Sequence, residues 1–277
     1  MENEQFRDGN SPITRRHILK LGCSALTVSQ WRTCGAQRQV EGTPVEKDGK
    51  QEPALPSAAE GRLLARPVQG QKAAPTGLQA VHLERKRDGL LYVPTGYRSD
   101  RPAPLALMLH GAGGNARQGL SLLQGLADHA GLILLAPDSR QQTWDVVRGQ
   151  FGPDVAYIER ALEKTFSLCA VAPDRVAVGG FSDGASYALS LGLTNGDLFT
   201  HVIAFSPGFL ALAKQRGRPR LFISHGTRDE VLPIQSCSRR IVPQVQRAGY
   251  DVRYREFGGP HTVPPEIARE AVSWFVE

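Results

Sequence analysis

Arg175-Val-Ala-Val-Gly-Gly-Phe-Ser-Asp-Gly-Ala-Ser-Tyr-Ala-Leu189 is the stretch of this sequence that decides the fold. It begins with an apolar run typical of a buried strand and ends with apolar residues at helical spacing. Between them, Gly180-Phe-Ser-Asp-Gly184 fits the pattern G-x-S-x-G. A strand-to-helix corner of this kind holds its serine in a strained backbone conformation, and the glycines leave room for neighbouring chains. The context therefore predicts a nucleophile at Ser182 rather than an ordinary tight turn.

The composition is that of an ordinary globular protein, with 277 residues of which 41% are hydrophobic and 22% charged. The net charge of +6 is spread along the chain, and no basic stripe interleaved with aromatic residues indicates binding to nucleic acid. The four cysteines form no C-x-x-C motif and no metal-ligand spacing, so we expect no metal site. Cys169 and Cys237 are predicted to be small buried apolar residues, although export would permit a disulfide.

Residues 1–36 resemble an export signal. Thr14-Arg-Arg-His-Ile-Leu-Lys20 resembles the twin-arginine pattern, with Ile18 where that pattern usually has phenylalanine. An apolar run at 21–28 and small residues at 34–36 follow, as in a secretory signal. This segment therefore predicts export to the periplasm or the extracellular space. A tail with a chance Arg-Arg pair, and hence a cytoplasmic protein, is the alternative.

Residues 37–76 are rich in Gln, Pro, Ala, Gly and charged residues and have no apolar periodicity. They are predicted to be a disordered linker that does not join the folded core. No apolar run in the chain approaches the length of a membrane span, so we expect no stable membrane insertion.

From residue 77 to residue 277, short apolar runs alternate with segments of helical periodicity. This alternation predicts one α/β domain with right-handed crossovers, in which a mostly parallel central sheet has helices on both faces. No stretch of sufficient length remains for a large cap domain. Asp154 is expected to cap the helix that follows it. The predicted strands are 90–93, 105–109, 132–136, 176–178, 201–205, 221–224 and 252–257.

Two loops after predicted strands offer the partners that a serine nucleophile needs, a base and an orienting acid. His225-Gly-Thr-Arg-Asp-Glu-Val-Leu-Pro233 presents Asp229, and Gly258-Gly-Pro-His-Thr-Val263 presents His261. Both loops follow parallel strands, whose carboxyl ends share one edge of the sheet. Asp229 is preferred to Glu230 as the acid, because its shorter side chain restricts where the carboxylate can lie.

Three further residues near this edge have a structural and a functional interpretation. His110 and His225 are expected to fix a turn and a strand end rather than to act in catalysis. Trp144 follows the strand at 132–136 and is a candidate for lining an acyl pocket, with an ordinary packing tryptophan as the alternative.

The order and spacing of four motifs resemble the α/β-hydrolase superfamily, in particular the phospholipase/carboxylesterase group and the related polyhydroxybutyrate-depolymerase-like esterases. The motifs are His110-Gly-Ala-Gly-Gly114, Gly180-Phe-Ser-Asp-Gly184, Gly226-Thr-Arg-Asp-Glu-Val-Leu-Pro233 and Pro260-His261. The resemblance implies a triad of Ser182 as nucleophile, His261 as base and Asp229 as acid. It also implies an oxyanion hole made of the backbone N–H groups of Ala112 and Asp183. The group often has a glutamine at the position of Asp183.

The resulting expectation is a serine hydrolase that cleaves carboxylic esters through an acyl-enzyme, without a metal or an organic cofactor. In the absence of a cap, small or flexible acyl esters are favoured as the small-molecule substrate, and lysophospholipids are among the candidates. A peptidase or thioesterase on the same scaffold is one alternative, because one triad serves several acyl groups. A non-catalytic binding protein with this fold is another. The sequence does not indicate an oligomeric state.

Overall fold

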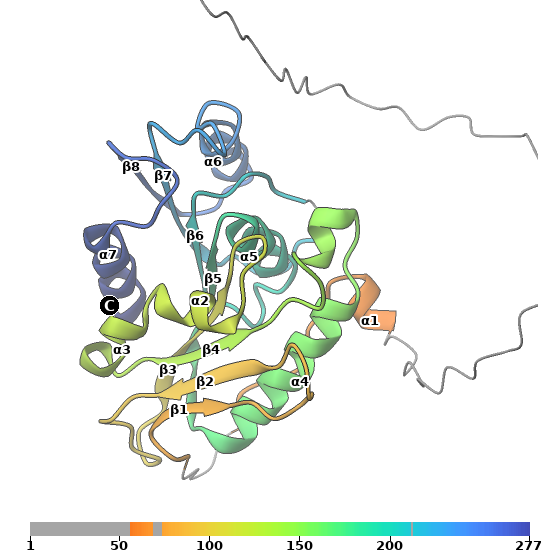
Figure 1. Ribbon diagram of the computed structural model, residues 1–277, viewed down its shortest axis with the longest axis vertical. Coiled ribbons are helices and arrows are strands. Elements are labelled where there is room, and N and C mark those ends of the chain that lie inside the picture. Colours follow the sequence, from red (N-terminus) through yellow and green to blue (C-terminus); the bar gives the residue numbers. More distant parts are fainter. Residues whose placement is uncertain (1–55, 69–73, 212) are drawn as a thin grey trace, which may run out of the picture. The chain divides into compact units, whose positions relative to one another are not determined.

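The computed structural model describes residues 56–68, 74–211 and 213–277. These residues belong to one compact unit, in which a central sheet carries helices on both faces (Figure 1). The predicted export signal at 1–36 lies outside the described residues, as do the parts of the predicted linker before residue 56 and at 69–73.

The sheet of the described unit has eight strands in the order β1-β2-β4-β3-β5-β6-β7-β8. β2 pairs antiparallel with both β1 and β4, whereas all other neighbours pair in parallel. The prediction of a mostly parallel sheet is therefore confirmed, and β1 is an additional edge strand. The strands are β1 Gly77–Ala80, β2 Gly89–Val93, β3 Ala103–Leu109, β4 Ile133–Pro137, β5 Val171–Phe181, β6 His201–Phe205, β7 Arg220–Gly226 and β8 Val252–Phe257.

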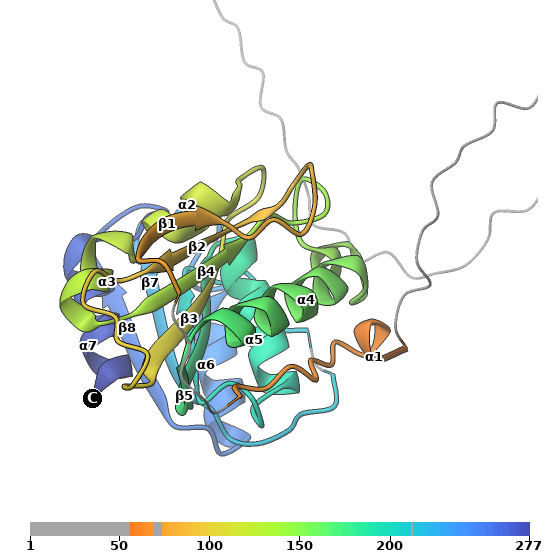
Figure 2. The ribbon, with the colours of Figure 1, turned by 90° about the horizontal axis from the view of Figure 1, so that it is seen from below.

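Two helix layers cover the sheet, because successive side chains of each strand face opposite sides. In β3, Leu105, Leu107 and Leu109 pack in a core with α4, α5 and α6, whereas Ala106 and Met108 pack in a second core with α2, α3 and α7 (Figures 1 and 2). None of the described helices has the length and apolarity that crossing a lipid bilayer requires. The helices are α1 Pro56–Ala59, α2 Ala116–Ser121, α3 Gln124–Ala130, the short 3₁₀ helix η1 Asp145–Arg148, α4 Pro153–Leu168, α5 Asp183–Thr194, α6 Ser238–Arg247 and α7 Pro265–Val276.

The expectation that Asp154 caps a helix is wrong. α4 begins at Pro153, and Gly152 is its N-cap residue, so Asp154 lies inside the first turn. Its side chain is buried, and its carboxylate accepts the backbone N–H groups of Arg140 and Asp145. Asp154 thus attaches the loop before α4 to the helix instead of satisfying the helix end.

The linker prediction is wrong for residues 56–68, which pack on the domain. Leu63 is fully buried in the core shared with α4 and α5. Its backbone N–H donates to Oδ1 of Asn195 at 2.8 Å, and the N–H of Ala65 donates to Oε1 of Glu159 at 2.8 Å. Because the segment is held by backbone hydrogen bonds to side chains of the domain, it needs no apolar periodicity and leaves none in the sequence.

Candidate active site

Ser182 stands at the corner between β5 and α5, with φ 58° and ψ −122°. A positive φ of this kind costs a residue other than glycine about 1–3 kcal/mol. A Cβ on Gly184 would lie 2.3 Å from the carbonyl oxygen of Leu109, and one on Gly180 would lie 2.6 Å from the backbone of Gly184. The corner therefore requires both glycines, and the predicted strained conformation of Ser182 is confirmed.

Asp229 and His261 follow the neighbouring strands β7 and β8 and face each other, with Nδ1 of His261 at 2.6 Å from Oδ2 of Asp229. The other carboxylate oxygen, Oδ1, accepts the backbone N–H groups of Val231 and Leu232 at 3.0 and 2.7 Å. Burial alone would raise the pKa of Asp229, but the N–H of Leu232 and the ring of His261 hold that pKa below its usual value. Asp229 is therefore an ionised acceptor for an imidazole N–H, as the orientation of a catalytic base requires.

The same loop carries Glu230 and His225, which occupy other positions. Glu230 is exposed, so the structure brings Asp229 rather than Glu230 to the imidazole. His225 is fully buried, with Nδ1 at 2.7 Å from Oγ of Ser238 and Nε2 at 2.8 Å from the carbonyl oxygen of Leu232 and 3.2 Å from Oδ2 of Asp229. Burial lowers the pKa of His225 and favours its neutral form, in which Nε2 donates and Nδ1 accepts. His225 thus supports the acid loop, which is the structural role expected of it.

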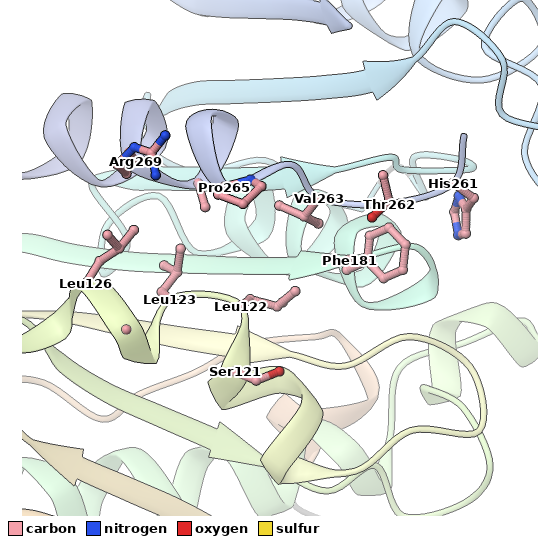
Figure 3. A pocket seen from close by; sticks show the side chains of 12 residues that line it. Ser121, Leu122, Leu123, Leu126, Phe181, His261, Thr262, Val263, Pro265 and Arg269 are labelled. Atoms are coloured by element: carbon pink, nitrogen blue, oxygen red, sulfur yellow. The ribbon is translucent and has the colours of Figure 1, made fainter. Parts of the chain in front are cut away.

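The candidate base lies next to the candidate nucleophile through Phe181, the residue that precedes Ser182. The ring centroids of His261 and Phe181 are 4.5 Å apart, with the planes tilted by 36°. Figure 3 shows the two rings side by side. Within the described residues, no hydrogen bond joins Oγ of Ser182 to His261. Catalytic hydrogen bonds are often long before substrate binds and shorten in the complex, so this geometry is compatible with a serine–histidine pair.

The loop after β3 passes beside the nucleophile, because a Cβ on Gly111 would lie 3.4 Å from Cβ of Ser182. The backbone N–H of Ala112 is donated to no protein group within the described residues. The same holds for the N–H of Asp183, which starts α5 and so has no partner inside its own helix. Both predicted oxyanion donors are therefore available to a ligand.

His110 and Trp144 form a buried support for this loop. Nδ1 of His110 donates to the carbonyl oxygen of Gly111 at 2.7 Å, and Nε2 accepts the backbone N–H of Ser139 at 3.0 Å. Trp144 is 0% exposed; its Nε1–H donates to the carbonyl oxygen of His110 at 2.8 Å, and its ring stacks on Tyr187 at a centroid distance of 5.1 Å. His110 thus fixes the turn, as expected. The suggestion that Trp144 lines an acyl pocket is wrong, because a fully buried ring offers no surface to a substrate.

Two contacts of the loop after β4 carry no signal in the sequence. Oγ1 of Thr143 donates to Oδ2 of Asp183 at 2.6 Å. Asp145 and Asp154 each donate a backbone N–H to Oδ2 of the other, at 2.7 and 2.8 Å. Burial and the nearby charge of Asp145 raise the pKa of Asp154 to about 6. Nine positions separate these two aspartates, so no motif within one element identifies them as a pair.

A groove of about 520 Å³ lies between the α2–α3 segment and the start of α7, and we call it the α7 groove (Figure 3). His261 and Phe181 line one end of it. Most of its other lining residues are apolar, among them Leu122, Leu126 and Val263. The groove leaves no signal in the sequence, because its walls come from helices that are far apart in the chain.

The cysteine and acidic side chains of the described residues do not form a metal site. Cys169 and Cys237 are both buried, as predicted. Within the described ranges, no three His, Cys, Asp or Glu side chains lie where they could hold a metal ion together.

Comparison with known sequences relates the chain to esterases. A family model described as phospholipase/carboxylesterase matches residues 135–266. A protein named probable feruloyl esterase C, from Aspergillus oryzae, is 30% identical over 168 residues, which cover 57% of this chain and 61% of the relative. The chain thus spans less than two thirds of the length of that relative.

Two solved structures share the fold. The fluorophosphonate-binding serine hydrolase F of Staphylococcus aureus has a TM-score of 0.58 and 14% identity, over 74% of this chain and 100% of that one. A phospholipase/carboxylesterase from Dyadobacter fermentans has a TM-score of 0.53 and 19% identity, over 76% of this chain and 100% of that one. At such identities the likeness concerns the fold alone. Together with the sheet order, it shows that the chain has an α/β-hydrolase fold, and the phospholipase/carboxylesterase family model matches residues 135–266 of it.

Proposed function

We propose that the protein is a serine carboxylesterase in which Ser182 attacks the ester, His261 is the base and Asp229 orients His261. The contact of 2.6 Å between Nδ1 of His261 and Oδ2 of Asp229, next to a serine held at φ 58°, carries the proposal. An N–H at Nδ1 that is donated to Asp229 leaves Nε2 without a proton. Nε2 can then accept the proton of the serine hydroxyl.

The proposed reaction has two halves. Oγ of Ser182 attacks the ester carbonyl while His261 takes the hydroxyl proton, and the backbone N–H groups of Ala112 and Asp183 stabilise the charge on the carbonyl oxygen. His261 then gives the proton to the leaving alcohol as the carbon–oxygen bond breaks, and the acyl group stays on Ser182. Water loses a proton to His261 and attacks this acyl-enzyme, which releases the carboxylic acid and restores the serine.

Small or flexible carboxylic esters are the proposed substrates. The apolar lining of the α7 groove supports an ester that carries an apolar portion, and lysophospholipids stay within this range. A relative named as a feruloyl esterase also supports carboxylic esters, and it favours them over the peptides and thioesters that the same triad could cleave.

The central test is the variant Ser182→Ala. It should lose hydrolysis of a p-nitrophenyl ester series from acetate to palmitate, since loss of the nucleophile in subtilisin costs about a million-fold in kcat. A fluorophosphonate probe should label the wild-type chain at Ser182 and leave the variant unlabelled, with circular dichroism to verify that both are folded. Wild-type turnover in Ser182→Ala contradicts the proposal. A folded wild-type chain that hydrolyses no ester and takes no label is instead the result expected of a binding protein.

A further inference from the structure

Arg269 is the one Lys, Arg, Asp or Glu side chain in the lining of the α7 groove. Arg269 is exposed, and Figure 3 shows it at the end of the groove away from His261. Pro265 and Ala268 line the groove from the same face of α7, because positions three and four apart in a helix are neighbours. The groove therefore runs from the candidate base, along apolar side chains, to a guanidinium group.

The guanidinium of Arg269 is available to a ligand. No hydrogen bond or ion pair holds it within the described residues. The next residue, Glu270, is already paired with Arg255 at 2.6 Å. No carboxylate lines the groove, so nothing in its lining neutralises the positive charge of Arg269.

The position of the imidazole decides which part of an ester enters this groove. In the proposed mechanism, His261 must reach the oxygen of the leaving alcohol in order to protonate it. Because His261 lines one end of the α7 groove, a substrate group that continues from that oxygen on this side of the imidazole would extend into the groove. The groove therefore faces the alcohol portion of the ester rather than the acyl portion.

We propose that the α7 groove binds the alcohol portion of the substrate, and that Arg269 selects alcohols that are apolar next to the ester and end in an anionic group. This inference rests on the proposed esterase function and specifies its substrate class. The partner is a small amphipathic ester whose apolar chain lies against Leu122, Leu126 and Val263. Its distal carboxylate or phosphate pairs with the guanidinium.

Two matched substrates and two matched variants test the role of Arg269. The acetate ester of ω-hydroxyhexanoate ends in a carboxylate, and that of ω-hydroxyhexanamide is its neutral counterpart. Arg269→Gln should lower kcat/KM for the anionic ester by about two- to fivefold, the range of an exposed ion pair, and leave the neutral ester unchanged. Arg247→Gln, on α6 at the opposite face of the sheet, removes the same charge elsewhere and should alter neither value. High salt should weaken the preference of the wild type for the anionic ester.

The outcomes separate this inference from the proposed function. The role of Arg269 is overturned if Arg269→Gln lowers kcat/KM equally for both esters. It is also overturned if Arg247→Gln lowers kcat/KM for the anionic ester as much as Arg269→Gln does. A wild type that hydrolyses the neutral ester faster than the anionic one overturns it as well. Hydrolysis of the neutral ester by the wild type supports the esterase function whatever Arg269 does.

The variant Gly125→Leu tests which part of the ester the groove holds. Gly125 lines the groove within α3, and a Cβ at this position meets nothing within 4 Å, so a larger side chain begins in open space. We expect it to lower kcat/KM for hexyl acetate several-fold more than for ethyl hexanoate, whose long chain is on the acyl side. The reverse order assigns the groove to the acyl group. If kcat/KM of Gly125→Leu equals the wild-type value for both esters, neither chain enters the groove.

Discussion

On one side of Ser182, the site depends on the side chains of Asp229 and His261, which meet at 2.6 Å. On the other side, the candidate oxyanion donors are the backbone N–H groups of Ala112 and Asp183. We refer to these as the acid–base side and the oxyanion side. Because the functional groups on the acid–base side belong to side chains, a conservative side-chain substitution there removes the functional group. On the oxyanion side, the donor is lost only when the backbone itself changes.

Two carboxylates depend on pH in opposite directions: Asp229 on the acid–base side, and Asp154, which holds the loop whose Thr143 contacts Asp183. The N–H of Leu232 and the ring of His261 outweigh burial and hold the pKa of Asp229 below its usual value, so this carboxylate stabilises the fold until pH falls through the lowered pKa. Near the oxyanion side, burial and Asp145 raise the pKa of Asp154 to about 6, so its contribution is lost as pH rises through that value. Both carboxylates accept two backbone N–H groups, but Asp229 lies beside imidazole rings and Asp154 lies beside a second carboxylate.

The largest effect in this comparison is expected from Asp229→Asn. Asparagine keeps the size of the side chain but presents an amide to Nδ1 of His261, which favours the wrong tautomer of the imidazole. By analogy with the serine protease triad, kcat should fall about ten-thousand-fold while the fold is kept. The measurement is the hydrolysis of p-nitrophenyl acetate, with circular dichroism as the check on folding.

Glu230→Gln is the matched control for Asp229→Asn, because Glu230 is exposed on the same loop. It should leave kcat near the wild-type value. If the two variants exchange their effects, the acid is Glu230. Mild effects in both would place the acid outside this loop and remove the distinction between the two sides.

A second large effect is expected from Ala112→Pro, which removes a backbone N–H on the oxyanion side. Loss of one oxyanion donor costs about a hundred- to a thousand-fold in kcat. Ala112 does not have the positive φ that proline cannot adopt. Ala112→Gly keeps the N–H, and we expect kcat within a few-fold of the wild type. Equal rates in the two variants would show that this N–H is not a donor in the reaction.

The same division explains what the sequence could predict. Ser182, Asp229 and His261 were found because their side chains act and each follows a strand in a motif, and the structure pairs Asp229 with His261; their catalytic roles stay predictions. Trp144 was correctly placed in the loop after β4, but strand order does not say whether a ring turns inward. The α7 groove is formed by helices distant in sequence and leaves no local pattern.

The missed packing of residues 56–68 has a related cause. Some of its hydrogen bonds join backbone N–H groups to Asn195 and Glu159, which lie about a hundred residues or more along the chain, and Arg62 also pairs with Asp197 at 2.8 Å. Backbone groups are the same at every position, so a search for apolar periodicity cannot detect them. The mostly parallel sheet, by contrast, follows from apolar runs that each strand carries in its own sequence.

A smaller effect is expected for Asp154→Asn, measured as stability against pH. The pKa of Asp154 rises from 3.8 in a model peptide to about 6 in the folded protein. This shift corresponds to about 3 kcal/mol of unfolding free energy. The folded state therefore holds this proton more tightly, and wild-type stability should fall as pH rises between these values. Asparagine cannot ionise, so the variant should gain up to about 3 kcal/mol relative to the wild type between about pH 4 and pH 7.

Urea unfolding at both pH values measures this change, and Asp174→Asn is the control because Asp174 is exposed. The control should unfold in parallel with the wild type. A wild-type minus Asp154→Asn difference that is the same at both pH values would contradict the opposite pH dependence of the two carboxylates.

The smallest effect is expected from Asp183→Asn. The proposed donor at this position is the backbone N–H, and the asparagine carbonyl oxygen can still accept the hydrogen bond from Oγ1 of Thr143, which is 2.6 Å long in the wild type. Rates for a neutral ester should therefore stay within about threefold, as for substitutions that remove no buried contact. An ester with a carboxylate close to the ester bond, such as O-acetylglycolate, should gain up to about fivefold, because a unit charge about 4 Å away in water contributes about 1 kcal/mol. A loss of about a hundred-fold with the neutral ester would instead equal the loss of an oxyanion donor. The side chain of Asp183, rather than its backbone N–H, would then be the functional group at this position.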